Sequence, residues 1–231
     1  MPRRIAVLPS IGFFVGAILS VTASMETVAD QRVTVRVYNN FGVPIKQLEA
    51  AQEIAAAIFR DASVDATWRD CHTRRGPSKT LSDRCDTALT ATEVIVRIVV
   101  APSPAENYRS QFGYSHVDTE THQGTLSTVF GDRIYASVRH LRIGAASVLG
   151  RVLAHEVTHL LMGTETHSTS GLMRATWSDN SLQRNAKQDW LLSRQEATLI
   201  AQALNARRQG SPIPVINLAA LQSQAVHETT R

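Results

Sequence analysis

Long apolar runs are scarce in this sequence of 231 residues, and the one clear example, residues 5–21, lies near the N-terminus. A protein with several membrane spans is therefore excluded. Aromatic residues make up only 6% of the chain, but hydrophobic residues make up 43% and charged residues 19%. This balance supplies enough apolar side chains for a core, so it excludes a wholly disordered chain and a collagen-like fibre. The length predicts one domain or a small pair.

A stripe of basic residues is also missing. The formal net charge is +4, from 24 basic and 20 acidic residues. Two of the basic residues, Arg3 and Arg4, belong to a segment that we expect to be removed, which leaves a net charge of about +2. Because no Lys/Arg cluster accompanies it, this charge does not predict nucleic-acid binding.

The N-terminal residues have the pattern of a secretory signal peptide. Arg3 and Arg4 precede the apolar residues 5–21, and small residues follow as far as Ser24. This order predicts cleavage after Ala23 or Ser24, so that residues 1–24 are removed and the remainder is secreted or periplasmic, without stable membrane association. The alternative is an uncleaved single-span anchor, although the proline and two glycines in the apolar run would weaken such a helix.

Cysteine occurs only twice, as Cys71 and Cys85, in a polar stretch. An even number of cysteines in an exported chain predicts one disulfide bond between them. The alternative is a pair of metal ligands, which is disfavoured because no histidine clusters with both cysteines.

The hydrophobic pattern of the mature chain predicts one mixed α/β domain over residues 25–209, followed by a tail at residues 210–231. Strands are expected at residues 32–38, 64–68, 93–100 and 125–130, and helices at residues 45–59, 145–162 and 193–206. Residues 134–141 fit either a strand or a helical turn, and residues 103–124 are expected to form an irregular surface segment. Gly163 is a natural helix stop, and Ser193 with Glu196 forms a capping box.

One motif carries specific chemistry: His155-Glu156-Val-Thr-His159, within the long predicted helix. Residues four positions apart share a helical face, so the two imidazoles can bind one Zn²⁺ ion. Glu156 lies beside them, where its carboxylate can accept a proton from a zinc-activated water without being a ligand. The spacing therefore indicates one catalytic zinc ion with Glu156 as general base.

The same spacing could arise by coincidence on a solvated helix. Here the motif is embedded in apolar residues, namely Val148, Leu149, Val152, Leu153, Leu160 and Leu161. A polar face of two histidines and a glutamate on such a helix destabilises the fold unless the polar groups have partners. A bound metal would supply them.

A catalytic zinc usually has three protein ligands and one open position, and the third candidate is His167. Gly163 breaks the helix between His159 and His167, so the chain can turn back beneath the metal. Glu165 and Glu196 are rival third ligands, although Glu196 also fits the capping box. The other histidines lie in polar or loop contexts and are expected at the surface: His72, His116, His122, His140 and His227.

The stretch H-E-V-T-H-L-L-M-G-T-E-T-H-S-T-S-G-L-M, residues 155–173, resembles the metzincin clan of zinc proteases and, within it, the matrixins. Metzincins have H-E-x-x-H-x-x-G-x-x-H followed by a tight turn that contains a methionine. Here the glycine falls one residue later and the third histidine two residues later. The stretch is closer still to uncharacterised exported bacterial proteins with H-E-I-G-H-L-L-L-G-x-x-x-H-S-x-x-G-I-M.

The resemblance implies a zincin-like fold, with a mixed sheet, an active-site helix and a C-terminal helix. It implies His155, His159 and His167 as zinc ligands, Glu156 as general base, Gly163 as the hinge and Met173 in the Met-turn. Met173 also fits a plain core methionine. Arg174 and Trp177 are expected either to line a specificity pocket or to pack the loop.

We therefore expect a secreted zinc-dependent endopeptidase that cleaves peptide or protein substrates. In zincins an edge strand beside the active-site helix binds extended substrate, and residues 125–130 are the candidate here. Two alternatives remain at this stage: a non-catalytic exported zinc-binding protein, and a zincin that hydrolyses cell-wall peptide bonds. The sequence indicates no oligomeric state.

Overall fold

A computed structural model of the chain describes residues 31–71, 85–102, 111–118 and 120–210. The predicted signal peptide, the tail beyond Gly210, His72 and His227 lie outside these residues. Among the residues that the structure does describe, no helix combines the length and apolarity that a membrane span requires.

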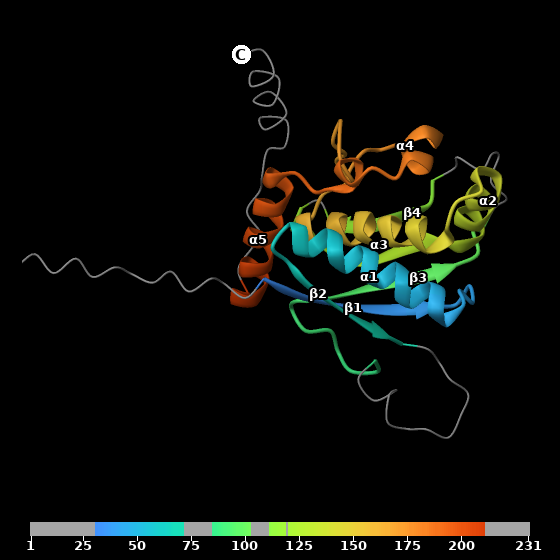
Figure 1. The fold of residues 1–231 in the computed structure, drawn as a ribbon. Helices are drawn as coiled ribbons and strands as arrows, with labels where there is room; N and C mark the ends of the chain where they lie inside the picture. Colours follow the sequence, from blue (N-terminus) through green and yellow to red (C-terminus); the bar gives the residue numbers. More distant parts are fainter. Residues whose placement is uncertain (1–30, 72–84, 103–110, 119, 211–231) are drawn as a thin grey trace, which may run out of the picture.

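In the described part of the chain, five strands form one twisted sheet (Figure 1). They are β1 (Arg32–Asn39), β2 (Asp65–Asp70), β3 (Glu93–Val99), β4 (Gly113–Asp118) and β5 (Gln123–Phe130), in the spatial order β2-β1-β3-β5-β4. The first four strands of that order are parallel, and β4 pairs antiparallel with β5 at the edge. The predicted mixed α/β fold class is confirmed.

Two long helices cover one face of the sheet and enclose the core. α1 (Ile45–Asp61) connects β1 to β2, and α3 (Ala145–Met162) lies beside it (Figure 1). Both helices follow the predicted apolar periodicity, and Gly163 ends α3 with the left-handed φ of 63°. The valines of β1 point at them and are fully buried: Val33, Val35 and Val37.

The remaining helices frame α3. α2 (Gly131–Leu141) follows β5 directly, and α4 (Asp179–Arg184) and a short 3₁₀ helix, η1 (Lys187–Trp190), lie in the segment after the motif. α5 (Arg194–Gln209) crosses the end of the sheet (Figure 1). The predicted capping box at its start is present, because the Ser193 and Glu196 side chains each bond the other's backbone N–H.

A buried ion-pair cluster lies on the opposite face of the sheet. Arg36 of β1 is only 2% exposed, and its Nη2 lies 2.6 Å from Oε2 of Glu93 on β3. Arg69 of β2 contacts the other carboxylate oxygen at 2.8 Å. Arg36 also donates to the carbonyls of Cys85 and Thr87. The predicted Cys71–Cys85 disulfide is formed, and it holds this covering segment to the end of β2.

Three expectations about the middle of the chain need correction or completion. β4 lies within residues 103–124, which we expected to be wholly irregular. The expected edge strand at residues 125–130 is instead an inner strand, because β5 is flanked by β3 on one side and β4 on the other. Residues 134–141, which fitted either type of element, belong to helix α2.

Candidate metal centre and catalytic cleft

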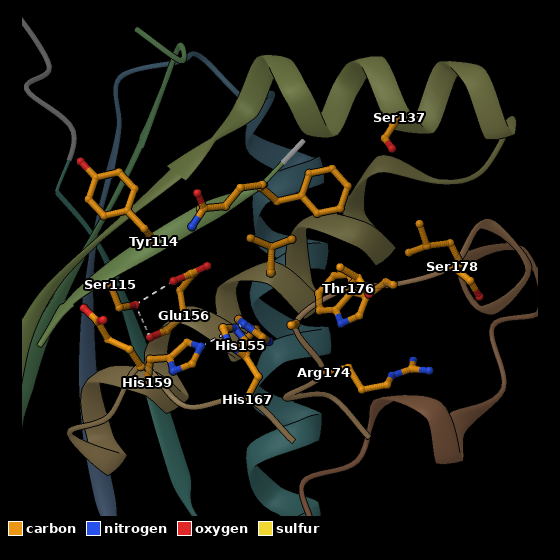
Figure 2. Close-up of a pocket in the computed structure, with 18 of the residues that line it drawn as sticks. Tyr114, Ser115, Ser137, His155, Glu156, His159, His167, Arg174, Thr176 and Ser178 are labelled. Atoms are coloured by element: carbon orange, nitrogen blue, oxygen red, sulfur yellow. Dashed lines mark hydrogen bonds between the residues drawn. The ribbon is translucent and has the colours of Figure 1, made fainter. Parts of the chain in front are cut away.

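The His-Glu-His motif lies on α3, in the buried interior of the fold. His155, Glu156 and His159 are 8%, 5% and 5% exposed, and the apolar residues around them are buried in the core. The two imidazoles, four residues apart, come from one helical face and point to one place (Figure 2). The sequence therefore builds a polar site into an otherwise apolar helix.

Both motif histidines are held in one tautomer by backbone carbonyls. His155 donates its Nδ1–H to the Leu172 carbonyl at 3.0 Å, and His159 donates its Nδ1–H to the Thr164 carbonyl at 2.7 Å. A carbonyl only accepts, so Nδ1 carries the proton in each ring. Burial lowers the pKa of His155 to about 4. Burial and the neighbouring His155 lower the pKa of His159 to about 3. Both rings are therefore neutral at neutral pH, and both Nε2 atoms are unprotonated.

These unprotonated nitrogens face each other. The Nε2 atoms of His155 and His159 lie 3.1 Å apart, with no proton available to bridge them. Two lone pairs at this distance repel, unless a cation lies against both. Two ligand nitrogens of a tetrahedral zinc ion, each bonded at about 2.0–2.1 Å, lie roughly 3.3–3.4 Å apart. The spacing and chemistry of the pair therefore fit zinc.

His167 completes the cluster. One ligand atom from each of the three histidines lies within 4.8 Å of the others. The His167 ring centroid is 5.3 Å from that of His155 and 4.8 Å from that of His159. Burial lowers the pKa of His167, although its side chain is far more exposed than the other two. Three neutral imidazoles are a suitable donor set for a zinc ion with an open position.

Gly163 allows the chain to turn from α3 toward His167. Its φ of 63° is left-handed, and its N–H bonds the His159 carbonyl. A Cβ atom at this position would collide with the backbone of His122, which approaches from the start of β5. His122 also bonds the Gly163 carbonyl through Nδ1 at 3.1 Å. The glycine is therefore required for its conformation and for the close approach.

Glu156 is held by the edge strand β4. The Ser115 hydroxyl contacts the Glu156 Oε2 at 2.7 Å and the Glu156 carbonyl at 2.8 Å (Figure 2). Two residues earlier, Gly113 leaves room for the carboxyl group, because a Cβ there would lie 2.9 Å from Oε1. Burial raises the pKa of Glu156 to about 7, against the opposing effect of the Ser115 hydrogen bond. A carboxyl group with this pKa can both accept and return a proton near neutral pH.

The rival third ligands do not join the histidine cluster. Among the described residues, the group that could bind one metal ion consists of His155, His159 and His167. It includes neither Glu165 nor Glu196. Glu165 lines the same cavity but lies on the exposed loop. Both carboxylate oxygens of Glu196 accept hydrogen bonds, one from the Ser168 hydroxyl and one from the Ser193 N–H.

The turn around Met173 supports the first histidine. Met173 is fully buried in the core, and Gly171 before it has a left-handed φ of 72°. The Leu172 carbonyl accepts from His155, and Trp177 Nε1 donates to it at 3.2 Å. The Trp177 ring also meets the His155 ring edge-on, with centroids 5.6 Å apart. The turn and Trp177 thus fix the ring plane of His155.

The cluster opens into a cavity of about 930 Å³. One wall comes from β4 and the residues before it, including Phe112, and the other from the segment that contains Arg174 and Trp177. Both of these expected pocket residues line the cavity, but Arg174 also braces the loop by donating to the Gly171 carbonyl at 3.0 Å. The histidines and Glu156 are therefore accessible to a large ligand.

Among the other described histidines, His116 and His140 are exposed, as expected, whereas His122 is half-buried against Gly163. The sequence alone did not point to Gly113 and Ser115 as residues of the site. Neither has a motif signal, because their contribution depends on pairing of β4 with β5 and on contact with a helix 41 residues away.

No protein-family model matches the sequence, and no curated protein matches it. Among solved structures, the chain is similar to archaemetzincin from Methanopyrus kandleri, with 12% sequence identity and a TM-score of 0.49. The match covers 78% of this chain and 99% of the archaemetzincin chain. A likeness at this level says nothing of activity, so the functional conclusion rests on the residues of the site.

Proposed function

We propose that the protein is a zinc-dependent endopeptidase. The observation that carries the proposal is the pair of unprotonated Nε2 atoms of His155 and His159, which face each other and His167 in an open cleft lined by Glu156. A zinc ion bound there would polarise a substrate carbonyl and lower the pKa of a water molecule. His155, His159 and His167 would be its protein ligands.

Glu156 is the general base in this proposal. Its carboxyl group lines the cavity beside the histidines, and its pKa of about 7 suits proton transfer at neutral pH. It takes the proton of the attacking water and then gives it to the leaving amine, so one residue serves both steps. Ser115 fixes one carboxylate oxygen by its hydrogen bond, while the other faces the space left by Gly113.

The substrate would be an extended peptide. Among the described strands β4 forms the sheet edge beside the cleft, and its outer side offers backbone N–H and carbonyl groups for strand addition. This mode binds main chain rather than particular side chains, which suits peptide or protein substrates. We therefore assign substrate binding, which we first expected of residues 125–130, to β4.

Export of the enzyme is supported by two features. The order of basic, apolar and small residues over residues 1–24 is typical of a cleaved signal peptide. The Cys71–Cys85 disulfide is typical of an oxidising compartment. We therefore infer that the protein acts outside the cytosol, in the periplasm or as a secreted protein.

The test combines zinc analysis with a peptide-library assay on two variants. Glu156→Gln keeps the shape of the side chain but cannot accept the proton, so peptide hydrolysis should fall by roughly two or more orders of magnitude with zinc retained. His155→Ala should lose stoichiometric zinc, whereas His140→Ala, on the exposed end of α2, should retain both zinc and activity.

Other outcomes would point elsewhere. Full zinc occupancy in His155→Ala would refute the metal site. Loss of zinc in Glu156→Gln would make Glu156 a structural group or a ligand. A wild-type protein that binds zinc tightly but cleaves no peptide would favour an exported zinc-binding protein, and cleavage of cell-wall peptides alone would favour a cell-wall hydrolase.

A further inference from the structure

The third candidate ligand lies on a loop with little burial of its own. Between Gly163 and Ser168, the side chains of Glu165, Thr166 and His167 are exposed. An exposed loop has no core packing to fix the direction of a side chain, so ordering it reduces conformational entropy. The His167 ring contacts the rings of His155 and His159, and the direction from which it reaches them also depends on contacts that fix the loop backbone.

Ser168, the next residue, supplies those contacts. Its N–H bonds the Met173 carbonyl at 2.8 Å, which joins the loop to the turn beneath His155. Its hydroxyl donates to Oε1 of Glu196, which is only 3% exposed. The chain immediately after His167 is thus attached on one side to the Met173 turn and on the other to α5.

Glu196 is itself held on a fixed element. Its second oxygen accepts the Ser193 N–H at 2.7 Å within the capping box. Farther along α5, Arg207 donates to the carbonyls of Leu160 at 2.7 Å and Gly124 at 2.9 Å. Leu160 directly follows His159, so the same helix contacts the chain next to two of the three candidate ligands.

We propose that Glu196 is a positioning residue for the third metal ligand and acts through Ser168. The inference rests on the zinc site of the proposed function. By fixing the backbone after His167, the hydrogen bond between Ser168 and Glu196 keeps the imidazole directed at the other two rings before metal binds. Loss of a group that orients a ligand in this way typically weakens metal affinity by about 10–100-fold.

A simpler role for Glu196 is helix capping alone. Two serine-to-alanine substitutions separate the roles, because each serine bonds Glu196 in a different way. Ser168→Ala removes the hydroxyl that links Glu196 to the His167 loop and leaves the capping box intact. Ser193→Ala removes the side chain that accepts the Glu196 N–H and leaves the link to Ser168 intact.

The experiment measures zinc affinity of the purified full chain by competition with a chromophoric chelator, together with the melting temperature of the metal-free protein. Ser168→Ala should weaken zinc binding by about 10–100-fold. Ser193→Ala should keep wild-type affinity but melt lower, because a helix cap is lost. Ser168→Thr, which restores a hydroxyl, should recover most of the affinity.

Wild-type affinity in Ser168→Ala would overturn the proposal, and so would an equal loss of affinity in both alanine variants. A His167→Ala protein with wild-type affinity would overturn it too, since there would be no third ligand to position. Failure of the peptidase proposal would give a different result. Wild-type protein would bind zinc and Ser168→Ala would weaken that binding as expected, but wild-type protein would cleave no peptide.

Discussion

The Ser115 hydroxyl lies 2.7 Å from Oε2 of Glu156, so a residue of the sheet edge determines where this carboxyl group of α3 points. The two residues are 41 positions apart and belong to different elements, β4 and α3. If β4 also binds substrate, one strand sets both the position of the peptide and that of the base that acts on it.

We expect Ser115→Ala to lower kcat by about 10–100-fold, because a misplaced catalytic group typically costs that much. KM and zinc content should stay near wild type, because the β4 backbone and the three histidines are unchanged. Steady-state kinetics on a peptide substrate will measure kcat and KM separately, and zinc analysis of the same samples will measure the metal content.

Ser127→Ala is the matched control. Ser127 is opposite Ser115 in the β4–β5 pairing, is fully buried, and has a hydroxyl with no hydrogen-bond partner among the described residues. Its removal should leave kcat within about twofold of wild type, because no hydrogen bond is lost. Equal losses in the two variants would mean that the sheet, rather than the Ser115 hydrogen bond, is responsible.

Gly163→Ala should strongly destabilise the protein. The alanine would have to adopt the left-handed φ of this position, and its Cβ would collide with the His122 backbone. Gly210→Ala is the control, because Gly210 has the same φ of 63° but a Cβ there would meet no atom of the described residues within 4 Å. Chemical denaturation should show a loss of about 1–2 kcal/mol for Gly210→Ala and a clearly larger one for Gly163→Ala. Equal losses would show that φ alone accounts for the effect.

The buried ion pairs of Glu93 predict a specific acid sensitivity. Burial alone would raise the pKa of Glu93, but hydrogen bonds from Arg36 and the Thr90 backbone amide outweigh it and lower the pKa from 4.5 to about 2. A carboxylate with a lowered folded-state pKa stabilises the fold above its ordinary pKa, and this stability is lost as the pH falls from about 4.5 to about 2.

Urea denaturation at a series of pH values will detect this loss. Glu93→Gln should be less stable at pH 7 by about 3 kcal/mol, because two arginines lose a buried partner. Its stability should also fall less steeply than that of wild type across the acidic range. Parallel curves for the two proteins would contradict the assigned pKa.

The disulfide predicts that the unfolded, unreduced protein contains no free thiol. Two labelled thiols would rule out the bond between Cys71 and Cys85. Reduction should lower the free energy of unfolding by about 3 kcal/mol on the loop-entropy estimate. The segment after Cys85 should stay attached to β1 after reduction, because the Cys85 and Thr87 carbonyls accept hydrogen bonds from Arg36.

The parts of the site that could be predicted are those that depend on the spacing of residues close in the sequence. The i, i+4 histidines, the apolar periodicity of α3 and the stop at Gly163 all depend on residues close in sequence. β4 could not be predicted, because Gly113–Asp118 lacks alternating apolar residues and forms a strand through its pairing with β5. Glu196 shows the same limit: its capping role is local, but its bond to Ser168 spans 28 residues.

The position of α5 in the chain affects the order in which the site can assemble. A chain that crosses a membrane or leaves the ribosome with its N-terminus first presents His155 and His159 before Glu196 and Arg207 have emerged. The contacts of these two residues with Ser168 and Leu160 form only after nearly all of the described chain is available. If Glu196 positions His167 as we propose, the ligand loop would be the last part of the centre to be fixed, and zinc would bind with full affinity only after α5 has emerged.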